Sequence, residues 1–164
     1  MIIQIRVDDR LIHGQVAVVW SKHFDTSHMV VANDAAASNE VQRMTLKMAT
    51  PSGVKVLIKS VDDSIEIFND PRSKDIKMYV LTDSIRDALK IAKNCEVKSI
   101  NVANVGRFDN SPEKVMLNPN IGVNKEELEA LKEVAELDIE TVQWIIPSHT
   151  KISIKKILEN IKEE

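Results

Sequence analysis

Short apolar segments rich in β-branched residues alternate with amphipathic segments along the whole chain. An apolar run of roughly four to eight residues is typical of a buried strand, whereas apolar residues spaced by three and four positions are typical of a helix face. Strands are therefore predicted over Ile2–Val7, His28–Ala32, Lys55–Ile58, Lys77–Leu81, Ser99–Val102 and Thr141–Ile145. Helices are predicted between and after them, over Gln15–His23, Asn39–Ala49, Ser84–Asn94, Asn124–Glu136 and Ser153–Glu163.

The order of these segments predicts the fold class. Repeated strand–helix–strand units pair their strands in parallel through right-handed crossovers. We therefore expect a single α/β domain over residues 1–164, doubly wound, with a mainly parallel sheet and helices on both faces. Residues Asn104–Pro119 show no such pattern and are rich in Gly, Asn, Pro and Ser, which predicts one long irregular loop.

Composition narrows the classes of function. The chain has a formal net charge of -3 and no basic stripe, so nucleic acid is not expected as a partner. Its single cysteine, Cys95, has no partner for an internal disulfide, which favours a reducing compartment. No signal peptide is expected, because the first apolar stretch is short and gives way at once to charge, and no apolar run approaches the roughly 20 residues that a membrane-spanning helix needs. A cytoplasmic domain is expected.

The segment Asp8–Gln15, with sequence DDRLIHGQ, carries more chemistry than any other. It lies where the first strand should end and the first helix begin, and ligands bind at that edge of open α/β sheets. A neutral His13 imidazole has a nitrogen lone pair for attack, and Arg10 could offer bidentate donors to phosphate oxygens. Gly14 allows unusual backbone angles and close approach of a phosphoryl group to free helix amides. Asp8 or Asp9 could orient the imidazole, so the segment predicts a phosphohistidine site.

Polar residues at the other strand ends extend the predicted site. They are Asn33, Asp34, Ser60, Thr82, Asp83 and the run from Asn104 to Arg107. The chain has no Walker-type motif and no G-x-G-x-x-G after the first strand, so a phosphoryl group would come from another protein rather than from a bound nucleotide. The other histidines, His23, His28 and His149, lack metal-ligand spacing, and no metal is expected.

Other interpretations of these residues stay open. Asp8 and Asp9 could simply cap the first helix and pair with Arg10. Because Asp8, Asp9, Asp34 and Asp83 all fall near strand ends, a receiver-like signalling domain that binds Mg²⁺ around a phosphoaspartate is an alternative. A binding module that only holds a small anion at the helix N-terminus is a third.

The stretch Ile5–Val16 closely resembles the signature of the IIB subunits of the mannose/fructose/sorbose family of the bacterial sugar phosphotransferase system (PTS). Weaker similarities follow in the expected order, at Val30–Asp34, Leu46–Gly53, Asn101–Arg107 and Gln143–Pro147. The resemblance therefore covers essentially the whole chain. One departure is Ala103, where many relatives carry glycine, so the resemblance does not fix the backbone path of that loop.

The resemblance implies a role for each site residue. His13 would carry the phosphoryl group, on Nδ1, Arg10 would stabilise the transferred charge, and Asp9 would help to orient the site. Backbone N–H groups near Gly14, together with Asn104 and Gly106 of the later loop, would bind the phosphoryl oxygens. No cofactor and no metal is implied.

The resemblance also implies partners. A phosphohistidine of a IIA protein or domain would be the donor. The acceptor would be a sugar hydroxyl, usually the 6-OH, presented by the membrane IIC/IID subunits, so the protein would be cytoplasmic and peripherally associated with the transporter. Relatives are often dimeric, which leaves a homodimer open, and the sequence does not name the sugar.

Overall fold

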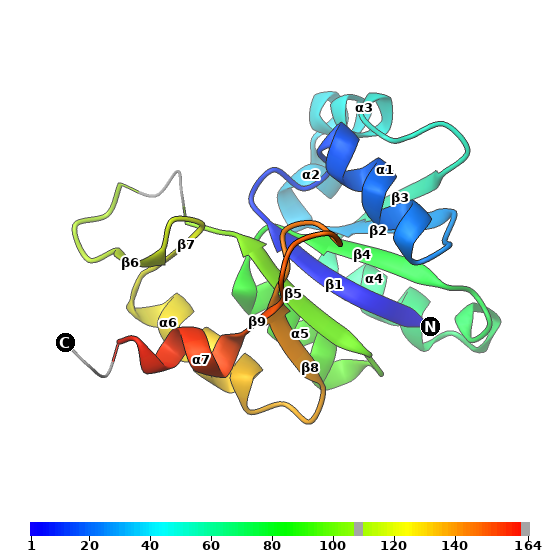
Figure 1. Ribbon diagram of the computed structural model, residues 1–164. Coiled ribbons are helices and arrows are strands. Elements are labelled where there is room, and N and C mark those ends of the chain that lie inside the picture. Colours follow the sequence, from blue (N-terminus) through cyan, green and yellow to red (C-terminus); the bar gives the residue numbers. More distant parts are fainter. Residues whose placement is uncertain (107–109, 162–164) are drawn as a thin grey trace.

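The predicted alternation builds one seven-stranded sheet with helices on both faces (Figure 1). The computed structural model describes residues 1–106 and 110–161. The strand order is β3-β2-β4-β1-β5-β8-β9, and every neighbouring pair is parallel except β8 and β9. These strands are β1 (Ile2–Asp8), β2 (His28–Ala32), β3 (Lys55–Lys59), β4 (Met78–Thr82), β5 (Ser99–Asn104), β8 (Glu140–Gln143) and β9 (Ile152–Ser153). The predicted doubly wound, mainly parallel α/β fold is confirmed.

Two apolar clusters hold the helices against the sheet. The first contains Ile5 and Val7 of β1 and is covered by α4 (Val61–Asn69), α5 (Ile85–Asn94), α6 (Lys125–Ala135) and α7 (Ile154–Glu159). The second contains Tyr79 of β4 and is covered by α1 (Gly14–His23), α2 (Asp34–Ser38) and α3 (Glu40–Met48). A short 3-10 helix, η1 (Pro71–Ser73), follows α4. Across the described residues, no helix has both the length and the apolar character needed to span a bilayer.

Besides the short elements η1 and β9, which were not predicted, the structure departs from the predicted elements at three places. Helices α2 and α4 were not predicted, although Asn33 and Ser60 are their N-caps, accepting from the amides of Ala36 and Asp63. Residues Asn104–Pro119 are not one irregular loop, because β6 (Val115–Asn118) pairs with β7 (Ile121–Val123) in an antiparallel hairpin. The Asn118 side chain closes its turn by accepting from the amides of Asn120 and Ile121.

Close packing of two glycines joins this hairpin to the end of β5. Gly106 has a φ of +73°, and a Cβ there would lie 2.0 Å from the carbonyl oxygen of Gly122. Two hydrogen bonds fix the approach, from the amide of Gly122 to Val105 O and from that of Val105 to Asn120 O. Gly106 is therefore required by backbone packing, whatever else it does.

We expect Gly106→Ala to lower the free energy of unfolding by roughly 2 to 5 kcal/mol, because a left-handed φ and a backbone clash both oppose the new side chain. Gly53 is the matched control, since it also has a positive φ, +85°, but nothing lies within 4 Å of its added Cβ. Gly53→Ala should cost only about 1 to 2 kcal/mol. Urea denaturation measures both, and equal losses would show that the contact with Gly122 carries no energy.

The strand order places the loop after β1 at a topological switch point. From β1 the chain enters α1 on one face, whereas from the neighbouring strand β4 it enters α5 on the opposite face (Figure 1). Loops that leave in opposite directions create the crevice in which open α/β sheets bind ligands. The segment Asp8–Gln15 lies at that position.

Candidate active site at the carboxyl end of the first strand

The loop between β1 and α1 turns tightly around two apolar anchors. Leu11 and Ile12 are buried in the cluster beneath α1, and the Leu11 amide donates to Asp8 O at 2.9 Å. Leu11 takes a left-handed φ of 58°, which is uncommon for a residue other than glycine. His13 follows these anchors and is exposed. The buried pair therefore fixes the backbone from which the imidazole projects.

His13 is the N-cap of α1, and its side chain leaves the helix end uncapped. Its φ and ψ of -124° and 115° are extended, and its carbonyl accepts from the Ala17 amide at 2.9 Å. Its imidazole makes no capping hydrogen bond. The first three amides of the helix, those of Gly14, Gln15 and Val16, have no acceptor in the described part of the chain. Free amides and the positive end of the helix dipole therefore lie beside the exposed imidazole.

One of the two predicted reasons for Gly14, unusual backbone angles, was wrong. Gly14 is an ordinary first residue of α1 without a positive φ. A Cβ there would meet only Ala49 O, at 3.9 Å, so neither backbone angle nor packing requires glycine. What glycine provides is an open surface above the first helix amide. Its part in binding a phosphoryl group stays a prediction.

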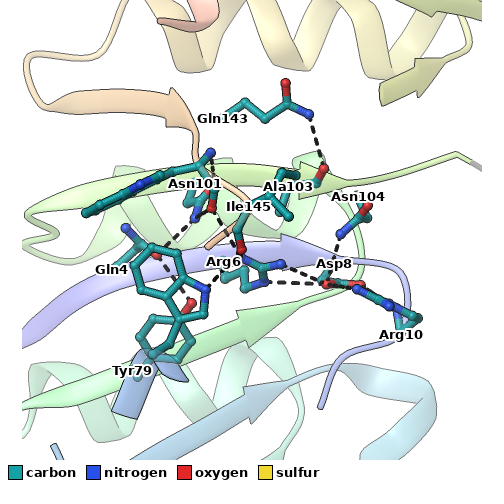
Figure 2. A network of polar contacts seen from close by, with 12 residues as sticks. Gln4, Arg6, Asp8, Arg10, Tyr79, Asn101, Ala103, Asn104, Gln143 and Ile145 are labelled. Atoms are coloured by element: carbon teal, nitrogen blue, oxygen red, sulfur yellow. Dashed lines mark hydrogen bonds and ion pairs between the residues drawn. The ribbon is translucent and has the colours of Figure 1, made fainter. Parts of the chain in front are cut away.

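The Asp8 carboxylate holds Arg10 rather than the imidazole (Figure 2). Its Oδ1 accepts from the Arg10 amide at 3.0 Å and from Nε at 3.2 Å, and its Oδ2 accepts from Nη2 at 3.1 Å. Asp8 is almost fully buried, whereas the Arg10 side chain is 30% exposed. The bidentate pair therefore fixes one edge of the guanidinium and leaves its outer edge toward solvent. The interpretation of Asp8 as a partner of His13 was wrong.

Burial by itself would raise the pKa of Asp8, but hydrogen bonds from Arg10 and the charges of Arg6 and Arg10 outweigh burial and lower the pKa below its ordinary value. A carboxyl whose pKa is lower in the folded state stabilises the protein above its unfolded pKa. This contribution disappears as the pH falls through the folded pKa.

We therefore expect Asp8→Asn to lower the free energy of unfolding at pH 7 by roughly 2 to 4 kcal/mol, because the variant removes a buried charge that two arginines share. The difference from the unsubstituted protein should shrink as the pH falls below about 4, where the aspartate of the unfolded chain takes up a proton, and should vanish as the pH falls through the lower pKa of the folded state. Denaturation across this pH range measures it. Asp70→Asn, which breaks an exposed pair with Arg72, is the control and should change stability little. If the loss of unfolding free energy in Asp8→Asn did not change with pH, the stabilising role of the Asp8 charge would be contradicted.

Asp9 and Asn104 adjoin this pair, whereas the contacts of Gly106 are with the hairpin and Lys114. The Asp9 amide donates to Asn104 O at 2.9 Å, and Asn104 Nδ2 donates to Asp8 Oδ2 at 3.2 Å, so one of the two amide hydrogens of Asn104 is already used. The Gly106 carbonyl accepts from Lys114 Nζ at 2.8 Å. Arg107, the last residue of the predicted run, lies outside the described residues. Orientation by Asp9 and phosphoryl binding by Asn104 and Gly106 stay predictions.

Four of the remaining strand-end polar groups serve the fold, among them Thr82, whose Oγ1 donates to Ser84 O at 3.3 Å. Asn33 and Ser60 cap helices, and Asp34 Oδ1 accepts from the Val61 amide at 2.9 Å. Within residues 1–106 and 110–161, no three His, Cys, Asp or Glu side chains are placed to hold a metal ion. With Asp8 engaged by two arginines, the described residues do not assemble the acidic pocket of a receiver-like domain.

Sequence reasoning missed Arg6. This side chain is only 1% exposed, and it reaches Asp8 from the middle of the central strand. The available signal was an arginine two positions before Asp8, because alternate strand residues point to the same face. Its partners beyond Asp8 come from the far end of the chain and could not be inferred.

Comparisons with known proteins agree with this geometry. A family model described as the PTS system sorbose subfamily IIB component matches residues 2–164. A probable phosphotransferase enzyme IIB component of Streptococcus pyogenes is 50% identical over 162 residues, covering 96% of this chain and 99% of that protein. The mannose-specific EIIAB component of Escherichia coli K12 is 28% identical over 156 residues, which are 95% of this chain and 48% of that protein.

A solved structure extends the match to three dimensions. The crystal structure of the IIBSor domain of the sorbose permease from Klebsiella pneumoniae superposes with a TM-score of 0.88 at 27% identity. The superposition covers 99% of this chain and 97% of that domain. Fold, length and sequence therefore agree, and the chain belongs to the sorbose-subfamily IIB components of the PTS, which are phosphotransferases of sugar uptake.

Proposed function

We propose that His13 is the residue of this IIB component that becomes phosphorylated. The observation that carries the proposal is the exposed imidazole at the open N-terminus of α1, on the same short loop as an arginine that a buried carboxylate holds in place. A dianionic phosphoryl group on His13 would meet the free amides of Gly14, Gln15 and Val16 and the positive end of the helix. Nδ1 is the ring nitrogen nearer the backbone, so a phosphoryl group there stays within reach of these amides.

The transfer runs in two steps. A lone pair of His13 attacks the phosphorus of a IIA phosphohistidine, so that a new P–N bond forms while the donor's P–N bond breaks. A sugar hydroxyl presented by the IIC/IID subunits then attacks the same phosphorus, the P–O bond forms, and the hydroxyl proton is released as His13 leaves. Arg10 lowers the barrier by stabilising charge on the transferring oxygens, because positioning and electrostatics dominate phosphoryl transfer. Asp9 orients this site, and Asn104 and Gly106 help to bind the phosphoryl oxygens.

The donor is proposed to be a IIA protein or domain. IIB components work with IIA and IIC/IID partners, and the Escherichia coli relative matched over about half of its length is an EIIAB component. No nucleotide motif adjoins the site, which also favours a protein donor. The protein would act at the cytoplasmic side of the transporter, and a homodimer is compatible with this arrangement.

The experiment is phosphorylation of the purified chain by phosphorylated IIA. We expect a covalent label that is stable in alkali and labile in acid, on the peptide that contains His13, with no requirement for Mg²⁺. Phosphorus NMR of the labelled protein then assigns the nitrogen. A label on an aspartate that hydroxylamine removes would contradict the proposal and favour the receiver-like alternative.

A further inference from the structure

Three consecutive inward positions of β1 are polar and buried. Gln4, Arg6 and Asp8 are each no more than 1% exposed, and alternation along the strand places them on one face, toward α1. Arginine and aspartate are rarely buried to this degree unless they are paired. Gln4 is the first of the three residues along the strand. Its Oε1 accepts from Tyr79 Oη at 3.3 Å and from Asn101 Nδ2 at 3.2 Å, so this buried oxygen has hydrogen-bond partners.

Arg6 joins Asp8 to the segment that follows β8. Its Nε and Nη2 donate to Asp8 Oδ2 at 3.4 and 3.3 Å, and its Nη1 donates to the carbonyls of Trp144 and Ile145 at 3.4 and 3.1 Å (Figure 2). Asn101 holds this segment from β5, because its side chain donates to Trp144 O at 2.7 Å and accepts from the Trp144 amide at 2.9 Å. The guanidinium of Arg6 therefore has fixed partners on both sides.

The Ile145 carbonyl also receives a hydrogen bond from α1. Trp20 Nε1 donates to it at 3.2 Å, so one oxygen accepts both from Trp20 of the helix that carries His13 and from Arg6 of the strand that carries Asp8. The Trp20 ring lies 5.9 Å from the Arg6 guanidinium carbon. This shared acceptor ties α1 to β1 directly beneath the loop that holds His13 and Arg10.

The charges of this cluster do not cancel. Asp8 carries one negative charge and lies between two arginines, so Arg6, Asp8 and Arg10 together carry one net positive charge. With Arg6 absent, Asp8 would neutralise Arg10, and the net charge of this cluster would fall to zero. Because Arg6 is buried and hydrogen-bonded to Asp8 and two carbonyls, it cannot itself touch a partner or a transferred group.

We propose that Arg6 is a positioning residue of the phosphotransfer site. It offsets the charge of Asp8, so that Asp8 can fix the guanidinium of Arg10 without cancelling its positive charge, and it ties this pair to α1 through Ile145 O. The proposal rests on phosphorylation of His13. The proposal assigns opposite effects to the two buried charges: Arg6 favours the phosphorylated chain, whereas Asp8 disfavours it. If the ion pair were purely structural, the loss of either partner would have the same effect.

The test measures the equilibrium constant and the rate of phosphoryl exchange between IIA and this chain. Arg6→Gln removes the offsetting charge, and we expect the constant to shift roughly three- to tenfold away from the phosphorylated chain. Arg6→Lys keeps the positive charge but lacks the planar set of guanidinium donors. Its equilibrium constant should return most of the way to that of the unsubstituted protein. Asp8→Asn should slow the exchange because Arg10 loses its anchor, yet leave the constant unchanged or shifted toward the phosphorylated chain.

Arg72→Gln is the matched control, because Asp70 and Arg72 repeat the Asp8–Arg10 geometry on an exposed surface. The proposal would be overturned if the Arg6→Gln variant folds and its equilibrium constant for phosphoryl exchange is unchanged. It would also be overturned if Asp8→Asn lowers the exchange rate and the equilibrium constant together. If Arg6→Gln does not fold, the test rests on Asp8→Asn. A slower exchange with an equilibrium constant that is not reduced supports the proposal. An unsubstituted chain that takes no label on His13 would instead refute the proposed function.

Discussion

Replacing His13 with glutamine abolishes phosphorylation by phosphorylated IIA, with a loss of at least about 10³-fold in the rate of label incorporation, because glutamine offers no nucleophilic ring nitrogen. The side chain is exposed and does not cap α1, so the substitution removes no contact on which the fold depends. Stability should therefore change by less than about 0.5 kcal/mol. Label incorporation and denaturation of the same preparation separate loss of chemistry from loss of fold.

His28→Gln provides the control for this variant. His28 is the first residue of β2, so it lies at the amino edge of the sheet, opposite the site, and its Nδ1 is 3.3 Å from Ser27 Oγ. It should accept the label at the rate of the unsubstituted protein. If His13→Gln were labelled equally well, the nucleophile would have to be another residue, and the proposed function would fail.

Features set by local sequence were predictable, whereas those set by distant contacts were not. Runs of β-branched residues predicted the six parallel strands of the sheet but not the short antiparallel strand β9, because a strand buried on both faces is apolar nearly throughout, whereas β9 is exposed. The caps at Ser84 and Asn124 were legible because their side chains accept from amides three residues later. Helix α2 was missed because five residues present too little periodicity. The β6–β7 hairpin was missed because β6 is exposed or half-buried and β7, although buried, has only three residues.

The same division applies to the site. His13 and Arg10 could be proposed as site residues because their segment has a dense local chemistry and a strong family resemblance. The sequence left open whether Asp8 pairs with Arg10 or orients the imidazole, because its side chain has three competing donors, and one of them, Asn104, lies 96 residues away in the sequence. The contact of Arg6 with Trp144 O spans 138 residues. No local pattern distinguishes a carboxylate that orients an imidazole from one that anchors an arginine.

Replacing Arg10 with glutamine is expected to slow phosphoryl transfer from IIA by roughly 10²- to 10³-fold, the usual cost of removing one preorganised charged donor from a transition state. KM for phosphorylated IIA should change far less than kcat, because the guanidinium is held by Asp8 to meet the transferring oxygens rather than the donor protein. Arg10→Lys keeps the charge but cannot reproduce the bidentate pair with Asp8, and it should recover only part of the rate. Single-turnover kinetics measure both variants.

Arg72→Gln shows whether these losses belong to the site. Arg72 donates to Asp70 from its amide at 2.9 Å, from Nε at 3.1 Å and from Nη2 at 2.8 Å, nearly the arrangement by which Arg10 holds Asp8. It follows α4, however, far from the loop that carries His13, and 90% of its side chain is exposed. Because the local motif is the same and only its place in the fold differs, Arg72→Gln should leave the transfer rate unchanged. A rate for Arg10→Gln within about threefold of the unsubstituted protein would mean that helix amides alone stabilise the transferring group.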